Sequence, residues 1–460
     1  MRYRREHDVL GSIMVPADVY YGSETMRAYK NFQVSGIKTD YSLIRAYVIL
    51  KRAAAKANMR IGKLEKRKGD AIIKACDFII KGGLWDNFVL DVFQAGAGTS
   101  TNMNVNEVIA NKAIEILGGK KGDYRIVHPN DDVNMSQSTN DSMPTAMRMA
   151  IFAEIRGRLL PELYKLIAAA KGKRDEFRGI VKLGRTHLQD AVPITLGQEF
   201  AGYVYALDST ADYINSANSR MLKLPIGGTA VGTGINTGRG YRKAVISEIR
   251  KATGTKFSLE VQPAGPMSNK LDELEVSSSL RECAVALNKF ANDLRLLNSG
   301  PRGGIGEIDL PAAQPGSSIM PGKINPSIAE MLNMVCFQVI GNDLSVNEAA
   351  NAGQLELNVY MPIIAFDILF SIIILSNGIR TFRERCIKGL KADRKRIKQN
   401  LDSDLSIATA LTPYIGYERA AKIARKALLE GKSVMQVCMS MKIMDRKKLE
   451  KILDPKNAVR

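Results

Sequence analysis

The stretch LDELEVSSSLRECAVALNKFANDLRLLN, residues 271–298, decides the fold class. Its apolar residues return every three or four positions, which is the spacing of one face of an α-helix. They are Leu274, Val276, Leu280, Val285, Leu287, Phe290, Leu294 and Leu297. No proline interrupts the stretch, and Pro301 follows beyond its end. At 1.5 Å per residue such a helix is a rod of roughly 40 Å, which favours a helical bundle.

Four further long helices are predicted, at 144–160, 195–222, 327–347 and 357–376. Pro144 is expected to open the first of them and Pro161 to lie near its end. The last is very apolar, but Pro362 and Asp367 interrupt it, so we expect a buried helix and no membrane span. Five long helices with wide apolar faces also indicate association with other subunits.

The flanking segments differ from this helical centre. Residues 1–140 alternate short segments with turn signals and contain two helical runs, at 42–59 and 68–81. Residues 391–460 read as short, basic helices. We therefore predict a mainly α chain of three domains: 1–140 is mixed, 141–390 is the helical bundle, and 391–460 is a small helical domain.

Composition narrows the function classes. The chain has 460 residues, 45% of them hydrophobic and 25% charged, so it can bury a large core. Lys+Arg 66 minus Asp+Glu 47 gives a net charge of +19. The charges are scattered and aromatic residues are only 6%, so we expect a solvated basic surface that could attract an acidic substrate, and no nucleic acid.

Cysteine and histidine usage argues against disulfides and zinc. The five cysteines stand far apart without a CxxC pair, which fits a reducing, cytoplasmic setting. There are three histidines and no HExxH, so we expect no metal site.

Four segments between the helical runs have a composition that helix packing does not require. They are GAGTSTNMN (96–104), SQSTND (136–141), GRTHLQD (184–190) and GSSIMPGKINP (316–326). Hydroxyl and amide side chains donate hydrogen bonds without a counter-charge, and glycines let backbone N–H groups approach an anion. One such loop is usually a turn or a helix cap, but four together suit a small ligand that carries carboxylates.

The fourth segment is the most informative. Gly316 and Gly322 bracket a possible hinged flap, and Lys323 and Asn325 at its far end could hold a carboxylate. It is not a nucleotide-binding loop, because Lys323 is followed by isoleucine instead of serine or threonine. His187 in the third segment is flanked by polar residues, so a structural and a catalytic histidine are equally plausible there.

Residues 316–326 are similar to the signature of the aspartase/fumarase superfamily, and the other three segments resemble that family's active-site segments in the same order. The likeness extends from Val15 to Tyr417. It implies a homotetramer whose central core has 20 long helices, five from each subunit. It also implies active sites assembled from three subunits, with no metal or organic cofactor.

The resemblance implies an anti elimination on a four-carbon dicarboxylate, through an aci-carboxylate intermediate. Ser317 would be the base, although a serine hydroxyl is a weak base unless its neighbours lower its pKa. Thr99, Ser138, Thr139 and Ser318 would bind the carboxylate that becomes the aci-acid, and Lys323 and Asn325 the other carboxylate. Asn140, Thr186 and His187 would face the leaving group, and Glu330 would pair with His187.

A second dicarboxylate site is implied by the segment HPNDDVN (128–134), which resembles fumarases. Its residues would be Arg125, His128, Asn130 and Asp131.

The motifs divide between aspartate ammonia-lyases and class II fumarate hydratases. Segments 20–22, 31–32, 88–92, 97–100, 138–141, 293–297 and 353–358 look like the former, and 128–134, 227–232 and 304–308 like the latter. Fumarases usually carry serine at Thr139 and phenylalanine at Leu355. Because the segments nearest the substrate favour it, we expect deamination of L-aspartate to fumarate, with hydration of fumarate to L-malate as the alternative.

Two other interpretations are less favoured. A catalytically silent relative would not need Ser317, Lys323, Asn325 and His187 intact. A sister lyase acting on argininosuccinate or adenylosuccinate usually has a shorter, different signature.

Overall fold

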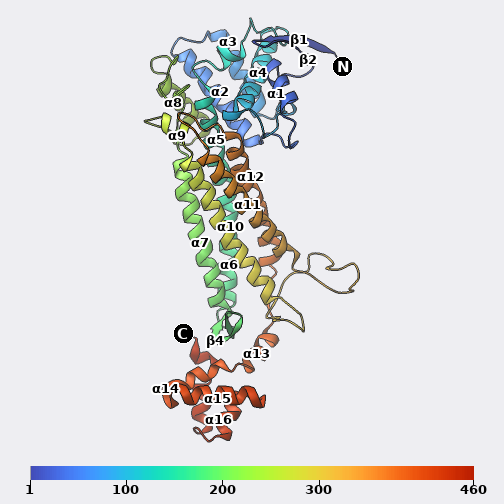
Figure 1. Cartoon of the computed structure of the whole chain (residues 1–460), viewed down its shortest axis with the longest axis vertical. Coiled ribbons are helices and arrows are strands. Elements are labelled where there is room, and N and C mark those ends of the chain that lie inside the picture. The colour runs from blue at the N-terminus through green and yellow to red at the C-terminus, as the bar shows by residue number, and fades with distance from the viewer. Residues whose placement is uncertain (1, 460) are drawn as a thin grey trace. The chain divides into compact units, whose positions relative to one another are not determined.

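The chain forms two compact units, each built from separated segments, and the computed structural model describes residues 2–459 (Figure 1). Unit 1 contains Met1–Leu160, Asp212–Glu282 and Phe337–Leu375, and unit 2 contains Pro161–Ala211, Cys283–Cys336 and Ser376–Arg460. Helices make up 62% of the structure, which confirms the mainly α class. The division into three domains at residues 140 and 390 stays a prediction.

Unit 1 consists of helices with short two-stranded pairings. Its elements are β1 Tyr3–Asp8, β2 Gly11–Pro16, α1 Ser23–Asn31, α2 Tyr41–Arg60, α3 Lys66–Ile80, α4 Thr99–Ile116, α5 Thr139–Glu154, β5 Lys223–Leu224, α8 Tyr241–Thr253, β6 Ser258–Leu259 and α9 Ala264–Ser268. Strands β1 and β2 pair antiparallel, and β5 and β6 pair parallel. The predicted helices at 42–59 and 68–81 are confirmed as α2 and α3.

Unit 2 carries an antiparallel hairpin and the C-terminal helices. Its elements are α6 Leu160–Glu176, β3 Val181–Thr186, β4 Gln189–Thr195, β7 Ile308–Asp309, β8 Lys391–Ala392, α13 Arg394–Asp402, α14 Thr412–Ile415, α15 Tyr417–Glu430, α16 Val434–Ser440 and α17 Arg446–Ile452. Both units receive residues from four long helices, α7 Leu196–Arg220, α10 Leu271–Leu297, α11 Ser327–Asn351 and α12 Met361–Phe382.

The two prolines of the first long helix do not lie where the sequence predicted. The helix begins at Thr139, because Ser138 and Asp141 form a capping box, and Pro144 lies inside α5. Pro161 does not mark the end either, since the helical backbone continues as α6 to Glu176. A π-turn over Ile155–Leu159 rearranges the hydrogen bonds just before Pro161, where this residue lacks an N–H donor.

Aromatic rings join the long helices within unit 2. Phe290 of α10 stacks on Tyr203 of α7 with the ring centroids 4.5 Å apart. It also meets Phe200 of α7 and Phe382 of α12 edge-on, at 5.9 Å and 5.5 Å. These pairs confirm that α7, α10 and α12 pack side by side in this unit, as a helical bundle requires.

Polar pairs join the long helices within unit 1. Asp343 of α11 accepts hydrogen bonds from Ser277 and Arg281 of α10. Asn342 of α11 donates to Ser371 of α12, and Ser345 donates to Asp367. Such pairs fix the register of neighbouring helices, because a slip would leave buried polar groups without partners.

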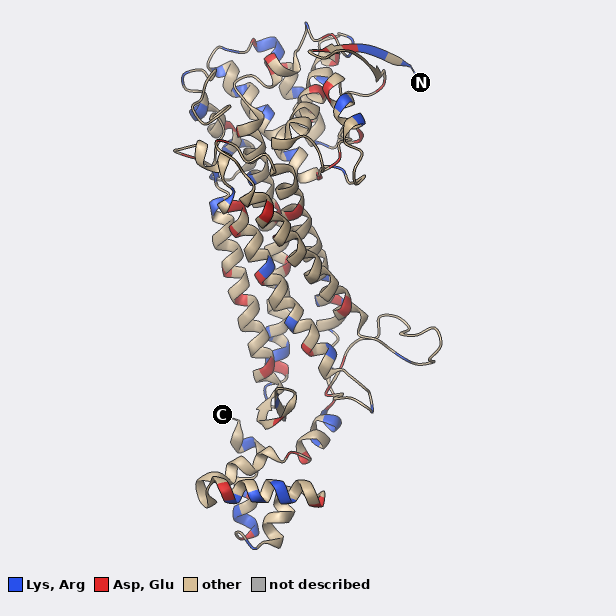
Figure 2. Cartoon of the chain, viewed as in Figure 1, with Lys and Arg blue, Asp and Glu red and all other residues tan. Residues whose placement is uncertain are grey.

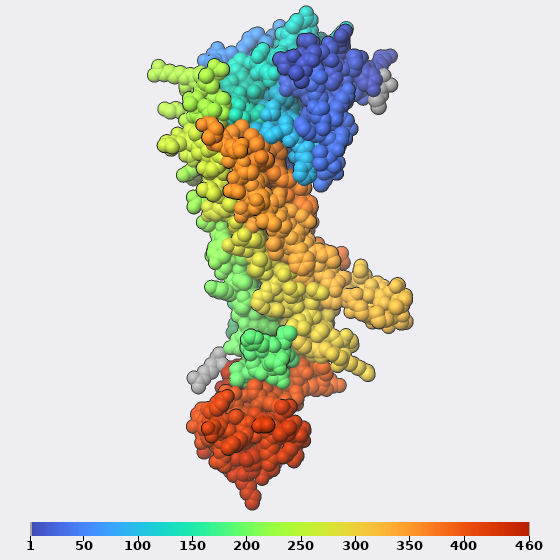
Figure 3. All heavy atoms as spheres, viewed as in Figure 1, coloured from blue at the N-terminus to red at the C-terminus, as the bar shows by residue number. Residues whose placement is uncertain are grey.

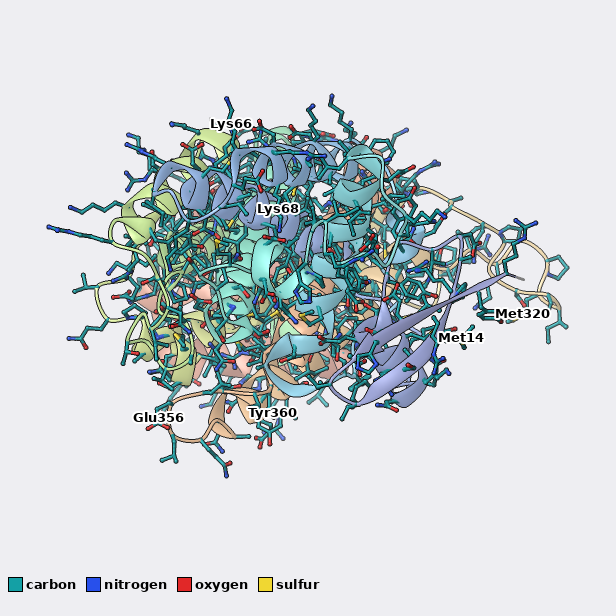
Figure 4. The ribbon with its side chains drawn as sticks, turned by 90° about the horizontal axis from the view of Figure 1, so that it is seen from above. Met14, Lys66, Lys68, Met320, Glu356 and Tyr360 are labelled. Carbon is teal, nitrogen blue, oxygen red and sulfur yellow. The ribbon has the colours of Figure 1, made fainter. Side chains whose placement is uncertain are left out.

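Helix α12 is the one described helix that is long and apolar enough to cross a membrane, with a mean hydropathy of 2.0, but 61% of the residues in its most apolar window are buried inside the protein. It is a core helix, as predicted. It begins four residues later than expected, because residues 351–360 form a turn in which Asn358 accepts a hydrogen bond from the backbone of Tyr360. Figure 4 shows Glu356 and Tyr360 on this turn.

Candidate active site

Two helices of unit 1 begin side by side. Thr99 is the first residue of α4 and Thr139 is the first residue of α5. A Cβ atom added at Gly98 would lie 2.9 Å from the sulfur of Met143 in α5, so only glycine permits this close approach. Each helix start presents unpaired N–H groups and a partial positive charge, which suits an anion.

The start of α5 holds three of the predicted substrate-binding residues. Ser138 caps the helix, and its hydroxyl accepts a hydrogen bond from the backbone of Asn140. The Asn140 side chain donates to the carbonyl of Ala230 at 2.8 Å. Asp141 underlies this turn and accepts backbone N–H groups from Ser138, Gly227 and Thr229. The structure thus brings Thr99, Ser138, Thr139 and Asn140 together at two helix starts.

A buried lysine that sequence reasoning missed lies behind this turn. Lys51 of α2 is fully buried, and its ammonium group donates to Asn102 and Asn134. Asn102 in turn donates to the Thr139 hydroxyl. The sequence held a signal, since helical spacing places Lys51 on the same face as Tyr47 and Ala54, both of which are buried.

In unit 2, Thr186 and His187 lie at the turn of the β3–β4 hairpin. Thr186 pairs with Gln189, so His187 and Leu188 form a two-residue turn. Both have positive φ angles, of 53° and 61°, which is the conformation that two-residue hairpin turns favour but that leucine adopts at a cost. The turn exposes the imidazole to solvent.

A buried carboxylate supports that hairpin from below. Glu307 is fully buried and lies 3.1 Å from Lys182 and 2.9 Å from Arg185, both in β3. Asn400 of α13 donates to the same carboxylate. Burial opposes its ionisation, but the hydrogen bond from Arg185 and the charge of Lys182 outweigh burial and hold the pKa of Glu307 below its usual range.

The predicted flap precedes α11 and protrudes as a separate lobe in Figure 3, with Met320 on it in Figure 4. The Ser317 hydroxyl accepts hydrogen bonds from the backbone N–H groups of Ile319 and Met320, at 3.2 Å and 3.0 Å. Donors of this kind stabilise a negative oxygen, which is what a serine base would need. Ser318 beside it is exposed.

The far end of the flap closes on its beginning. Lys323 donates to the side-chain oxygen of Asn325 at 2.7 Å, and Asn325 donates to the carbonyl of Gly316 at 2.8 Å. The backbone N–H of Gly316 donates to the carbonyl of Lys323. The structure therefore brings Lys323 and Asn325 together, as predicted, in an exposed position.

Glu330 lies in the first turn of α11, with its carboxylate 3.8 Å from Arg295. Among residues 2–459 no ion pair joins Glu330 to His187, and no hydrogen bond joins the hairpin turn to the flap. The Glu330–His187 pairing stays a prediction.

The residues of the implied second dicarboxylate site have other partners. Arg125 forms two hydrogen bonds with Asp123, and the Nδ1 atom of His128 accepts the backbone N–H groups of Asn130 and Asp131. The Asn130 side chain bonds to Glu24, the pKa of which is raised by burial. Dicarboxylate binding here stays a prediction.

Comparison with known proteins follows the same lines as the geometry. Residues 11–341 match the family model described as Lyase, and residues 407–460 match the model described as Fumarase C C-terminus. Aspartate ammonia-lyase of Bacillus subtilis is 46% identical over 453 residues, which is 98% of this chain and 95% of that protein. Fumarate hydratase class II of the same organism is 43% identical over 460 residues, covering 100% and 99%.

Solved structures show the same fold. Fumarate lyase:delta crystallin from Brucella melitensis, bound to cobalt, is 47% identical with a TM-score of 0.94, covering 99% of both chains. Recombinant class II fumarase from Schistosoma mansoni is 37% identical with a TM-score of 0.95, covering 99% of this chain and 98% of that one. The relatives therefore carry two activities at nearly equal similarity.

Proposed function

Because the chain belongs to the aspartase/fumarase superfamily of lyases, we propose that it is an aspartate ammonia-lyase, which removes ammonia from L-aspartate to give fumarate. The observation that carries the proposal is the pair of helix starts at Thr99 and Thr139. Neutral hydroxyl groups and backbone donors converge there without a counter-ion, so they can stabilise a carboxylate as its charge grows.

The proposed reaction begins when Ser317 removes a proton from the carbon next to one carboxylate. The electrons move into that carboxylate, which becomes the aci-acid and is held by Thr99, Ser138, Thr139 and Ser318. Lys323 and Asn325 hold the other carboxylate. Ammonia then leaves from the neighbouring carbon, on the side of Asn140, Thr186 and His187. Two backbone donors on the Ser317 oxygen support its role as the base.

We propose that the sites are completed in a homotetramer. The long helices in Figure 2 carry few charged residues. They also leave large apolar side chains exposed, among them Tyr205, Tyr213, Val285, Met334, Phe337 and Leu344. A face of this kind is typical of a subunit interface. Copies of the chain would bring the hairpin turn and the flap to the helix starts of unit 1.

Fumarate hydratase is the second candidate, and specific segments favour it. Residues 128–134, 227–232 and 304–308 resemble fumarases. Residue 139 favours the aspartase, because fumarases usually carry serine there. Threonine adds only one methyl group, a change worth about 1–3 kcal/mol of discrimination, so Thr139 alone does not exclude water as the leaving group.

One experiment separates the two candidates. The purified tetramer is incubated with L-aspartate or with L-malate, and the conjugated double bond of fumarate is followed by ultraviolet absorbance. We expect the larger kcat/KM with L-aspartate. A larger value with L-malate would assign the hydratase instead, and no fumarate from either substrate would refute both candidates.

A further inference from the structure

Lys51 has an environment that a merely structural lysine does not need. It is fully buried in unit 1, and no described carboxylate forms an ion pair with it. Its Nζ atom lies 2.7 Å from the side-chain oxygen of Asn102 and 2.7 Å from that of Asn134. Burying an ammonium group is costly, so a residue of this kind usually serves a function.

The ammonium group dictates how Asn102 is oriented. Lysine has donors and no acceptor, so each of its partners must present an oxygen. The oxygen of the Asn102 amide therefore faces Lys51, and its nitrogen faces away. That nitrogen donates to the Thr139 hydroxyl at 3.0 Å.

The orientation of Asn102 then decides what Thr139 can do. A hydroxyl has a single hydrogen to donate. Because the Thr139 oxygen accepts from Asn102, this hydrogen is left for another acceptor. Thr139 is the first residue of α5, beside the start of α4, where an anion is favoured. A carboxylate offers only acceptors, so the hydrogen left on Thr139 suits it.

We infer that Lys51 is a positioning residue for the proposed reaction: it sets the direction of the chain Lys51–Asn102–Thr139, so that the Thr139 hydroxyl donates to the substrate carboxylate. The inference rests on the proposed function and extends it to a residue that does not touch the substrate. Without Lys51 the Asn102 amide is free to turn over. Its oxygen would then accept the Thr139 hydrogen, and the site would lose one donor.

The direction of this chain does not depend on the charge of Lys51. Burial lowers the pKa of Lys51 to about 7, with Asp141 and Cys76 acting in the opposite sense. The ring of Tyr47 also faces the amine, 6.0 Å from Nζ. A neutral amine still has two N–H donors, so it can keep both asparagine oxygens facing it.

Two substitutions of Lys51 test the inference. Lys51→Met removes the donors at similar size, and we expect kcat to fall about 100-fold, with a smaller change in KM, because the donor acts mainly as charge develops. Lys51→Gln restores N–H donors without charge, and we expect it to recover at least tenfold of the loss. Equal loss in both variants, or a kcat for Lys51→Met within twofold of the natural protein, would overturn the inference.

Two further variants guard against a trivial explanation. Lys270→Met removes the other fully buried lysine of unit 1, which does not contact this chain, and should leave kcat within twofold. Asn102→Asp keeps Lys51 paired, so it should fold even where Lys51→Met does not. Its carboxylate can only accept from Thr139, so we expect a loss as large as that of Lys51→Met. Full activity of Asn102→Asp would contradict the inference.

The readout also separates this inference from the proposed function. The natural protein is first assayed with L-aspartate and L-malate, and activity on either substrate allows the kinetic comparison. If neither reacts, the proposed function fails and calorimetric affinity for succinate becomes the readout. We then expect Lys51→Met to weaken succinate binding at least tenfold and Lys51→Gln to weaken it less. Unchanged affinity in both variants would refute the positioning role.

Discussion

At the scale of single residues, Ser317 is the position where the proposed chemistry is most sharply testable. Its hydroxyl accepts two backbone N–H groups, which are the partners that an alkoxide would need. Replacing Ser317 with alanine removes the proposed base but leaves the flap backbone free to keep its turn. We expect fumarate formation to disappear, by at least about a thousandfold in kcat, while size-exclusion chromatography shows an unchanged assembly.

Ser299 provides the matched control for this substitution. It also lies in a loop of unit 2, and its hydroxyl also accepts a backbone N–H group, from Ile305. Ser299→Ala should retain turnover within about twofold. Comparable turnover in Ser317→Ala would show that another group removes the proton.

At the scale of elements, the start of α5 depends on Asp141. This fully buried carboxylate accepts three backbone N–H groups, from Ser138, Gly227 and Thr229. Asp141→Ala leaves these donors without a partner, and each such loss costs about 1–3 kcal/mol. We therefore expect the free energy of unfolding to fall by about 3 kcal/mol or more, measured by denaturant titration.

The exposed Asp70 of α3 serves as the comparison for this loss. Asp70→Ala should change the free energy of unfolding by less than about 0.5 kcal/mol, as surface substitutions usually do. Similar values for the two variants would show that Asp141 does not hold the turn.

The start of α10 gives stability a dependence on pH. Burial lowers the pKa of Lys270 from 10.5 to about 8. Between these values the unfolded chain binds more protons than the folded chain, so stability rises with pH, by up to about 1.4 kcal/mol per unit for one group. This contribution is complete above the unfolded pKa and is lost as the pH falls through 8.

Lys270→Met should remove that rise. Melting temperatures of the natural protein and the variant, recorded between pH 8 and pH 10, should diverge in favour of the natural protein as the pH increases. Parallel curves would mean that Lys270 keeps an ordinary pKa in the folded chain.

The elements show why much of the fold could be predicted and some of it could not. Helix α10 was placed to within a residue, because its apolar spacing and the proline beyond it are local signals. The ends of α5 were misplaced, because a capping box and a π-turn outweighed the prolines. The starts of α4 and α5 meet through tertiary packing at Gly98, which no local pattern shows.

The candidate site divides in the same way. The four polar segments were found from composition, and the flap was confirmed as a loop with Lys323 and Asn325 in contact. Lys51 and Glu307 were not recognised as supports. Their partners Asn102 and Asn400 are 51 and 93 residues away along the chain, so the contacts exist only in the folded protein.

At the scale of the whole molecule, the proposed assembly from several copies can be tested by mixing inactive variants. Ser317→Ala removes the base on the flap of unit 2, and Thr139→Val removes a carboxylate donor in unit 1. If copies share sites, hybrid tetramers formed by dissociation and reassembly contain some sites with both groups intact. We expect activity to return to about a quarter of the natural value for random pairing. No recovery in verified hybrids would place each site within one copy.

The net charge of +19 adds a second expectation at this scale. A basic surface raises the local concentration of a dianionic substrate, and added salt screens this attraction. We expect kcat/KM to fall as sodium chloride is raised from low to high concentration. A flat response would leave the basic residues as a means of solubility alone.

The Glu307 carboxylate has a consequence for the last seventy residues. It receives Asn400 from α13, and its backbone carbonyl accepts the N–H of Asp393, so the chain beyond Leu390 is tied to the strand that carries His187. All the proposed catalytic groups precede that point. A proteolytic nick after Leu390 would nevertheless loosen the footing of the histidine, and a trimmed enzyme would be impaired although every reactive side chain was still attached.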